Sequence, residues 1–179
     1  ATDPPTRRAL WAIVAADLPV AIARRRLTTD TTYFVNSATG NNNNSGESAG
    51  SPWQTIQFAV SYVGANLDLA GAYNVTIQLA DGTYVENGTL PPYIGRGTQG
   101  HAGPVLIQGN SGTPSNVVVQ PASGNTFTAV ETGAFEYTLK DMRLNAAGAT
   151  CVQADAISWV CMNNVVFGAA TIHVQAING

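Results

Sequence analysis

The sequence predicts an all-β protein in which short strands stack into a solenoid. Charged residues make up only 11% of the chain, and Lys140 is its single lysine, whereas Gly, Asn and Thr are plentiful. Because exposed helical surfaces usually carry Glu and Lys, this composition favours strands and turns. Two further observations, a recurring strand pattern and a fixed residue spacing, define the type of β structure.

The recurring pattern begins after Asn74, where short apolar runs alternate with Gly, Asn and Pro. Three of these runs end in Gln, namely residues 75–78, 105–108 and 117–120. Self-similar segments of this kind are typical of repeat architectures.

The spacing is 22 residues in two registers near the C-terminal end. Val130-Glu131, Val152-Gln153 and Val174-Gln175 follow one another at this interval. Adding 22 to four further apolar residues also leads to apolar residues: Phe135, Tyr137, Leu139 and Leu144 fall on Ile157, Trp159, Cys161 and Val166.

A period near 22 residues is long enough for two or three short strands and their turns, which make one coil of a solenoid. Residues 22 apart then lie above one another at the strand spacing of about 4.8 Å. We therefore expect coils over residues 73–179, with Val130, Val152 and Val174 in one interior column and Leu144 above or below Val166. Leucine-rich repeats need a Leu-x-x-Leu-x-Leu frame, which the sequence lacks.

A capping region is predicted over residues 31–72, before the first coil. Residues 31–35 are rich in Thr, Tyr, Phe and Val and indicate a strand, and residues 40–50 form a loop of Asn, Ser and Gly. A helix is predicted over residues 52–66, with Ser51 as its N-cap and Pro52 at its first position. Its apolar face, which we expect to cover the open end of the coils, consists of Trp53, Ile56, Val60, Val63 and Leu67.

Residues 1–30 are predicted to form an attachment segment. A short helix over residues 6–17 presents an apolar stripe that it cannot bury alone, and three arginines follow Pro19. We expect this segment to bind its own symmetry mates or another protein rather than to fold back on the coils. The candidate partner-binding residues are Leu10, Trp11, Ile13, Val14, Leu18, Arg24, Arg25 and Arg26. Asp17 and Pro19 argue against a signal peptide, and the apolar run is too short to span a bilayer.

Charge and cysteine usage exclude several classes of function. The net charge is −3 and the arginines form no basic face, which argues against nucleic-acid binding. Cys151 and Cys161 lie ten residues apart, without CxxC or His spacing. We expect buried free thiols, with a disulfide or a metal site as alternatives.

Five motifs follow one another along the chain: Tyr33-Phe34-Val35-Asn36, Thr39-Gly40, the loop 41–46, residues 51–60 and residues 73–84. Together they resemble the opening of pectate-lyase-like right-handed parallel β-helix proteins, particularly those of phage and prophage tail fibres and tailspikes. The resemblance covers about residues 24–120, and residues 9–32 are similar to the junction between a fibre stalk and its β-helix. It implies a right-handed parallel β-helix, a homotrimer and a virion location.

The chemistry of a polysaccharide-cleaving enzyme is only weakly indicated. A glycosidase needs two carboxylates about 5–9.5 Å apart, and only Glu131 and Asp155, on adjacent predicted coils, are candidates. Lys140, Asp141 and Arg143 are interpreted as the solvated face of one strand. His101 and His173 are each unaccompanied by other catalytic residue types.

We therefore expect a structural virion protein, a fibre or tailspike segment of the tail or head appendage that projects a β-helix shaft for host-surface adhesion. Its expected partners are two further copies of itself, other phage structural proteins at the N-terminus and host-surface polysaccharide, with no nucleic acid and no membrane insertion. No cofactor and no metal ion are expected. The alternatives are a depolymerase tailspike, acting as lyase or glycoside hydrolase, and a secreted carbohydrate-binding β-helix.

Overall fold

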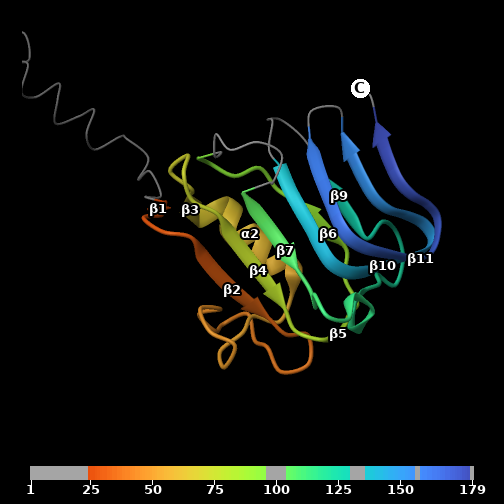
Figure 1. Ribbon diagram of the computed structural model, residues 1–179, viewed down its shortest axis with the longest axis horizontal. Helices are drawn as coiled ribbons and strands as arrows, with labels where there is room; N and C mark the ends of the chain where they lie inside the picture. The colour runs from red at the N-terminus through yellow and green to blue at the C-terminus, as the bar shows by residue number, and fades with distance from the viewer. Residues whose placement is uncertain (1–23, 96–103, 130–135, 156–157, 178–179) are drawn as a thin grey trace, which may run out of the picture.

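The computed structural model describes residues 24–95, 104–129, 136–155 and 158–177. Strands dominate these residues and form a curled parallel sheet, which confirms the all-β prediction (Figure 1). The elements in chain order are β1 (Arg25–Arg26), β2 (Thr31–Val35), α2 (Ile56–Asn66), β3 (Leu67–Asp68), β4 (Val75–Leu79), β5 (Gly82–Tyr84), β6 (Gly88–Leu90), β7 (Val105–Gln108), the 3-10 helix η1 (Pro114–Asn116), β8 (Val117–Val119), β9 (Phe127–Ala129), β10 (Glu136–Asp155) and β11 (Trp159–Ile177).

The strands pair in three stacks, and every pairing between these named strands is parallel. The first stack runs β2–β4–β7–β10, the second β5–β8–β10 and the third β6–β9–β10. β10 bends through all three stacks, and β11 follows it along its length (Figure 1). From β4 onward, each pass of the chain adds a strand to each stack.

The core lies inside these stacks and is built from columns of apolar side chains. Strand β4 alternates buried and partly exposed residues, as expected for a strand with one face inward. Tyr33, Ile77, Ile107 and Leu139 are paired in successive strands, and all four are fully buried. Burial of such side chains contributes about 1.5–3 kcal/mol each to folding.

The predicted 22-residue register is correct in one part of β10 and wrong in another. Val152 pairs with Val174, as predicted, whereas Leu139 pairs with Met162 and Leu144 with Phe167 rather than with Val166. The register shifts on either side of Ala146, so the spacing changes along the strand pair. A shift of one residue exchanges the two faces of a strand. The apolar pattern of the sequence did not reveal this register shift, because β11 has apolar residues on both faces.

Two members of the predicted interior column, Val152 and Val174, lie among the described residues. Val152 on β10 is 1% exposed, whereas Val174 on β11 is 49% exposed. Val130 lies outside the described residues, as do Phe135 and Ile157 of the second register.

Helix α2 begins four residues later than predicted. Its N-cap is Thr55, whose hydroxyl accepts the backbone N–H of Phe58 at 3.2 Å, so the predicted cap at Ser51 and first position at Pro52 are wrong. Trp53 is extended instead: it forms a parallel bridge with Val35, and its ring stacks on that of Tyr33 at 4.7 Å. Trp53 thus has the spacing of a helical residue in the sequence, but it packs against Tyr33 beside the sheet.

The buried face of α2 contains Ile56, Val60 and Val63, as predicted, and Leu67 follows as the first residue of β3. The helix contacts β2, β4 and β6. In the first pass of the chain it takes the place that a strand of the third stack occupies in later passes. It therefore closes the core at this end, opposite to β11.

Candidate functional site

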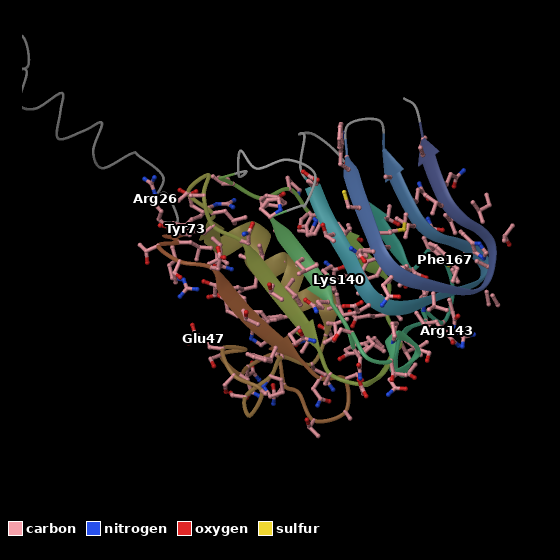
Figure 2. All side chains as sticks on the ribbon, in the orientation of Figure 1. Arg26, Glu47, Tyr73, Lys140, Arg143 and Phe167 are labelled. Carbon is pink, nitrogen blue, oxygen red and sulfur yellow. The ribbon has the colours of Figure 1, made fainter. Side chains whose placement is uncertain are left out.

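The outer face of the first stack carries a row of side chains that point away from the core. Phe34 of β2 pairs with Gln78 of β4, Gln78 with Gln108 of β7, and Gln108 with Lys140 of β10. Neighbouring members of the row are one strand spacing apart, about 4.8 Å. Figure 2 shows Lys140 on this face of the sheet and Arg143 farther along β10, at its bend.

Two adjoining hollows lie at the carboxyl ends of these strands. The first has a volume of about 220 Å³ and a mostly apolar lining, to which Phe34, Ala49 and Pro52 contribute. The second has a volume of about 290 Å³ and a polar lining, to which Asp81, Gln108, Asn110 and Ser111 contribute. The hollows share Gln78, Leu79 and Ala80, and we refer to the two together as the outer groove.

The polar side chains of the outer groove are held in place by hydrogen bonds. The Gln78 amide donates to the backbone carbonyls of Gln108 and Gly109 at 3.2 and 3.0 Å. The Asp81 carboxylate accepts the side-chain amides of Asn110 and Asn116 at 2.9 and 3.0 Å. The groove therefore has one apolar side and one side of positioned amide and carboxylate groups, an arrangement suited to binding a neutral polar ligand.

The interpretation of residues 140–143 as a solvated strand face is wrong for Asp141, which is only 2% exposed. Its carboxylate accepts the Asn164 amide at 2.7 Å and lies 3.8 Å from the Lys140 ammonium. Asp141 and Asn164 both have positive φ, 55° and 54°, a conformation that Asp and Asn tolerate better than most residues. They form a structural ladder at the corner where β10 and β11 turn between stacks.

Neither side chain of the weak catalytic pair is among those that the structure describes. Glu131 lies outside the described residues, and so does the Asp155 side chain, although the Asp155 backbone pairs with Ile177 in β11. Each other acid of the described part of the chain has a structural partner. The contacts are those of Asp30 with Asn74, Glu47 with Arg25, Asp68 with Ala70, Asp81 with Asn110, Glu86 with Ile56, Glu136 with Cys161, and Asp141 with Asn164.

Glu86 has a role that the sequence patterns did not reveal. Its two carboxylate oxygens accept the backbone N–H groups of Ile56 and Gln57, each at 2.8 Å, at the first turn of α2. Burial raises the pKa of Glu86, and the two amide hydrogen bonds oppose this rise. No acidic residue lies in the helix's own first turn. The missing acid in the first turn was the only sequence signal that a distant residue caps this helix, because Glu86 lies thirty residues after Ile56.

Only the last part of the predicted attachment segment is described, and it contacts the body of the protein. Arg24 donates to the backbone carbonyl of Gly64 in α2, and Arg25 donates to the Tyr33 hydroxyl and pairs with Glu47 at 3.7 Å. Leu27 is buried in the core. At least residues 24–27 therefore pack against helix α2 and the neighbouring core. This differs from the expectation that the whole segment does not fold back on the coils.

Arg26 lies in β1, which pairs in parallel with β3, and its side chain is exposed. The other candidate partner-binding residues, Leu10, Trp11, Ile13, Val14 and Leu18, lie outside the described residues. Binding of a partner by this segment stays a prediction.

The cysteines and histidines provide no reactive centre in the described part of the chain. Cys151 is buried and Cys161 partly buried, and neither forms a disulfide. Burial raises the pKa of each thiol, which disfavours the nucleophilic thiolate. His173 stacks on Phe167 with ring centroids 4.9 Å apart, and His101 is not described. Among the described residues, no three His, Cys, Asp or Glu side chains are grouped as a metal site.

The fold and the groove thus define a class: a mostly β protein with a curled parallel sheet, capped at one end by a helix and bearing a polar groove on its outer face. Comparisons with protein-family models, with curated proteins and with solved structures find no match. Within the described ranges, no helix combines the length and apolarity needed to cross a membrane.

Proposed function

We propose that this chain is a structural segment of a phage or prophage fibre or tailspike, which projects a β-helix shaft and adheres to a host-surface polysaccharide. The observation that carries the proposal is the stacking of parallel strands in three columns, closed by α2 at one end. Such a stack grows in one direction from a closed base, which is the property that a projecting shaft requires.

The finer fold in this proposal is a right-handed parallel β-helix. Three stacks, each receiving a strand from successive passes of the chain, support it. Right-handed connections are also the strong preference for parallel strands joined across a sheet.

Adhesion is assigned to the outer groove. Pyranose rings have apolar C–H faces and hydroxyl rims, and the groove offers Phe34 and Pro52 on one side and Gln78, Gln108 and Asn110 on the other. Amides donate and accept hydrogen bonds, so they suit neutral hydroxyl groups. Asp81, the acid that lines the outer groove, accepts two side-chain amides. This favours binding over catalysis in the groove, since a general acid or base must be free to exchange a proton with substrate.

Anchoring is assigned to the N-terminal attachment segment, residues 1–30. The functional unit is proposed to be a homotrimer in the virion. The alternatives, a depolymerase tailspike and a secreted carbohydrate-binding β-helix, make different predictions for the same experiments.

Three measurements test the proposal. The first is the location of the labelled chain on purified particles, where absence from the virion would favour the secreted protein. The second is deletion of residues 1–22, which should abolish incorporation into particles while leaving thermal unfolding nearly unchanged. The third is a turnover assay on capsular and pectic polysaccharides, where no cleavage is expected. Cleavage that is lost in Glu131→Gln or Asp155→Asn would instead support the depolymerase.

Binding in the outer groove is tested separately by titrating neutral polysaccharide into the wild-type protein, Phe34→Ala and Gln78→Ala. Both substitutions should weaken binding at least about tenfold, which corresponds to about 1.4 kcal/mol. Val85→Ala is the control, because Val85 is 68% exposed and lines neither hollow. Equal affinity in all four proteins would remove adhesion from this groove.

A further inference from the structure

Two side-chain amides beside the first hollow of the outer groove, the one with the apolar lining, are each held in one orientation. Asn36 lines this apolar hollow, and its Oδ1 accepts the backbone N–H groups of Ala38 and Thr39 at 2.9 and 3.1 Å. Gln78 lines both hollows, and its Nε2 donates to the backbone carbonyl of Gly109 at 3.0 Å. One end of each amide is therefore fixed by the protein backbone.

The opposite ends of these two amides are available to a ligand. Within the described ranges, Asn36 Nδ2 donates to no group and Gln78 Oε1 accepts from none. Both residues are partly exposed. The backbone nearby is engaged, since the Val35 carbonyl accepts the Ala80 N–H and the Tyr84 hydroxyl. The apolar hollow thus has one oriented donor and one oriented acceptor beside it.

The apolar hollow is large enough for more than a water molecule. Its volume is about 220 Å³, and Phe34, Ala49 and Pro52 contribute to its lining. An apolar cavity of about 150 Å³ is sufficient to hold benzene. A methyl group and the atoms that carry it therefore fit into this hollow, and removing them from water is favourable because the lining is apolar.

Among the substituents that sugars carry, the acetamido group matches these three features. It presents an N–H donor, a carbonyl acceptor and a methyl group within a few bonds of one another. A hydroxyl group lacks the methyl, a carboxylate donates no hydrogen bond to Gln78 Oε1, and an ammonium group accepts none from Asn36 Nδ2. Charged groups are in addition costly to bury in an apolar hollow.

We propose that the outer groove recognises the acetamido group of an N-acetylhexosamine unit. Its methyl group enters the apolar hollow, its carbonyl oxygen accepts from Asn36 Nδ2, and its N–H donates to Gln78 Oε1. The sugar ring then lies over the second hollow, which Asp81, Asn110 and Ser111 line. The inference rests on the proposed adhesion in this groove and adds the class of sugar that is bound.

The test titrates N-acetylglucosamine and N-acetylgalactosamine into the full-length chain, each against its parent sugar, glucose or galactose, with binding followed by NMR. The two sugars of a pair differ only in having an acetamido or a hydroxyl group at one carbon. At least one N-acetyl sugar should bind at least about tenfold more tightly than its parent, which corresponds to about 1.4 kcal/mol.

Two variants locate this preference in the groove. Asn36→Asp keeps the oxygen that accepts Ala38 and Thr39 but removes the donor. Ala49→Leu fills the apolar hollow from an exposed position. In both variants the affinities for the N-acetyl sugar and its parent should approach equality. Ala38→Leu is the matched control and should keep the preference, because Ala38 is exposed and lines neither hollow.

Circular dichroism and thermal unfolding establish that the variants fold. Equal affinities of the wild type for each N-acetyl sugar and its parent would overturn this proposal while leaving adhesion to neutral polysaccharide in place. A preference that persists in both folded variants would also overturn it, because the acetamido group would then bind elsewhere. Absence of binding by all four sugars would overturn it as well, and the separate titration with neutral polysaccharide then decides whether adhesion fails too.

Discussion

The carboxylate of Glu86 binds the backbone N–H of Ile56 at 2.8 Å and thereby supplies a cap to a helix that begins thirty residues earlier in the chain. Its second oxygen binds Gln57, so one side chain satisfies two of the orphan donors of the first turn. At the other end of α2, Arg24 donates to the Gly64 carbonyl. A negative charge near the N-terminus of a helix and a positive charge near its C-terminus both stabilise it, because each lies at the end of the helix dipole that has the opposite sign.

Replacing Glu86 is therefore expected to destabilise the first turn of α2. Glu86→Ala should lower the free energy of unfolding by about 2 kcal/mol, because it removes two charge-assisted hydrogen bonds. Chemical denaturation of both proteins measures the difference. Glu47→Ala is the control, since the Glu47 side chain is 62% exposed and makes only a surface ion pair with Arg25. A Glu86→Ala protein as stable as Glu47→Ala would contradict the capping role.

The raised pKa of Glu86 predicts a pH effect with a definite sign. Because the folded-state pKa lies above its ordinary value of 4.5, the folded protein holds the Glu86 proton more tightly than the unfolded chain. The associated stability is fully present below pH 4.5 and is lost as pH rises through the folded pKa. The difference in unfolding free energy between the wild type and Glu86→Gln, measured across this window, should therefore shift against the wild type as pH rises. A shift in the opposite direction would mean that the two hydrogen bonds outweigh burial.

The Val152–Val174 column predicts unequal effects of the same substitution on paired residues. Val152→Asp should cost several kcal/mol, because it places an unpaired carboxylate in a dry column at a site 1% exposed. Val174→Asp at a site 49% exposed should cost much less. Thermal unfolding of both variants gives the comparison. Similar losses would show that Val152 does not occupy an interior column.

The corner ladder predicts that Gly109 tolerates no side chain. A Cβ at this position would lie 2.2 Å from the backbone oxygen of Asp141, so the chain would have to shift. Gly109→Ala should therefore destabilise the protein by more than 1 kcal/mol, a typical cost of overpacking. Gly112→Ala is the matched control, since its nearest atom would be 3.5 Å away. Equal stability of the two variants would show that the corner is not tightly packed.

The sequence by itself determined the class of the fold and much of its interior. Apolar residues that recur 22 apart predicted that Val152 and Val174 would stack, and helical spacing predicted that Ile56, Val60 and Val63 would share a buried face. Both patterns are local consequences of strand and helix geometry, which fix the face that a side chain takes. They can be read without knowledge of which segments meet.

The tertiary structure alone decided the remaining contacts. It set the pairing of Leu144 with Phe167, brought Trp53 out of the predicted helix and into contact with Tyr33, and placed Glu86 at the start of α2. The outer groove likewise arises only because β2, β4 and β7 lie side by side. Such contacts depend on the length and shape of the turns between strands. A turn that is one residue longer moves every later side chain to a new partner, while the local pattern of apolar and polar residues stays the same.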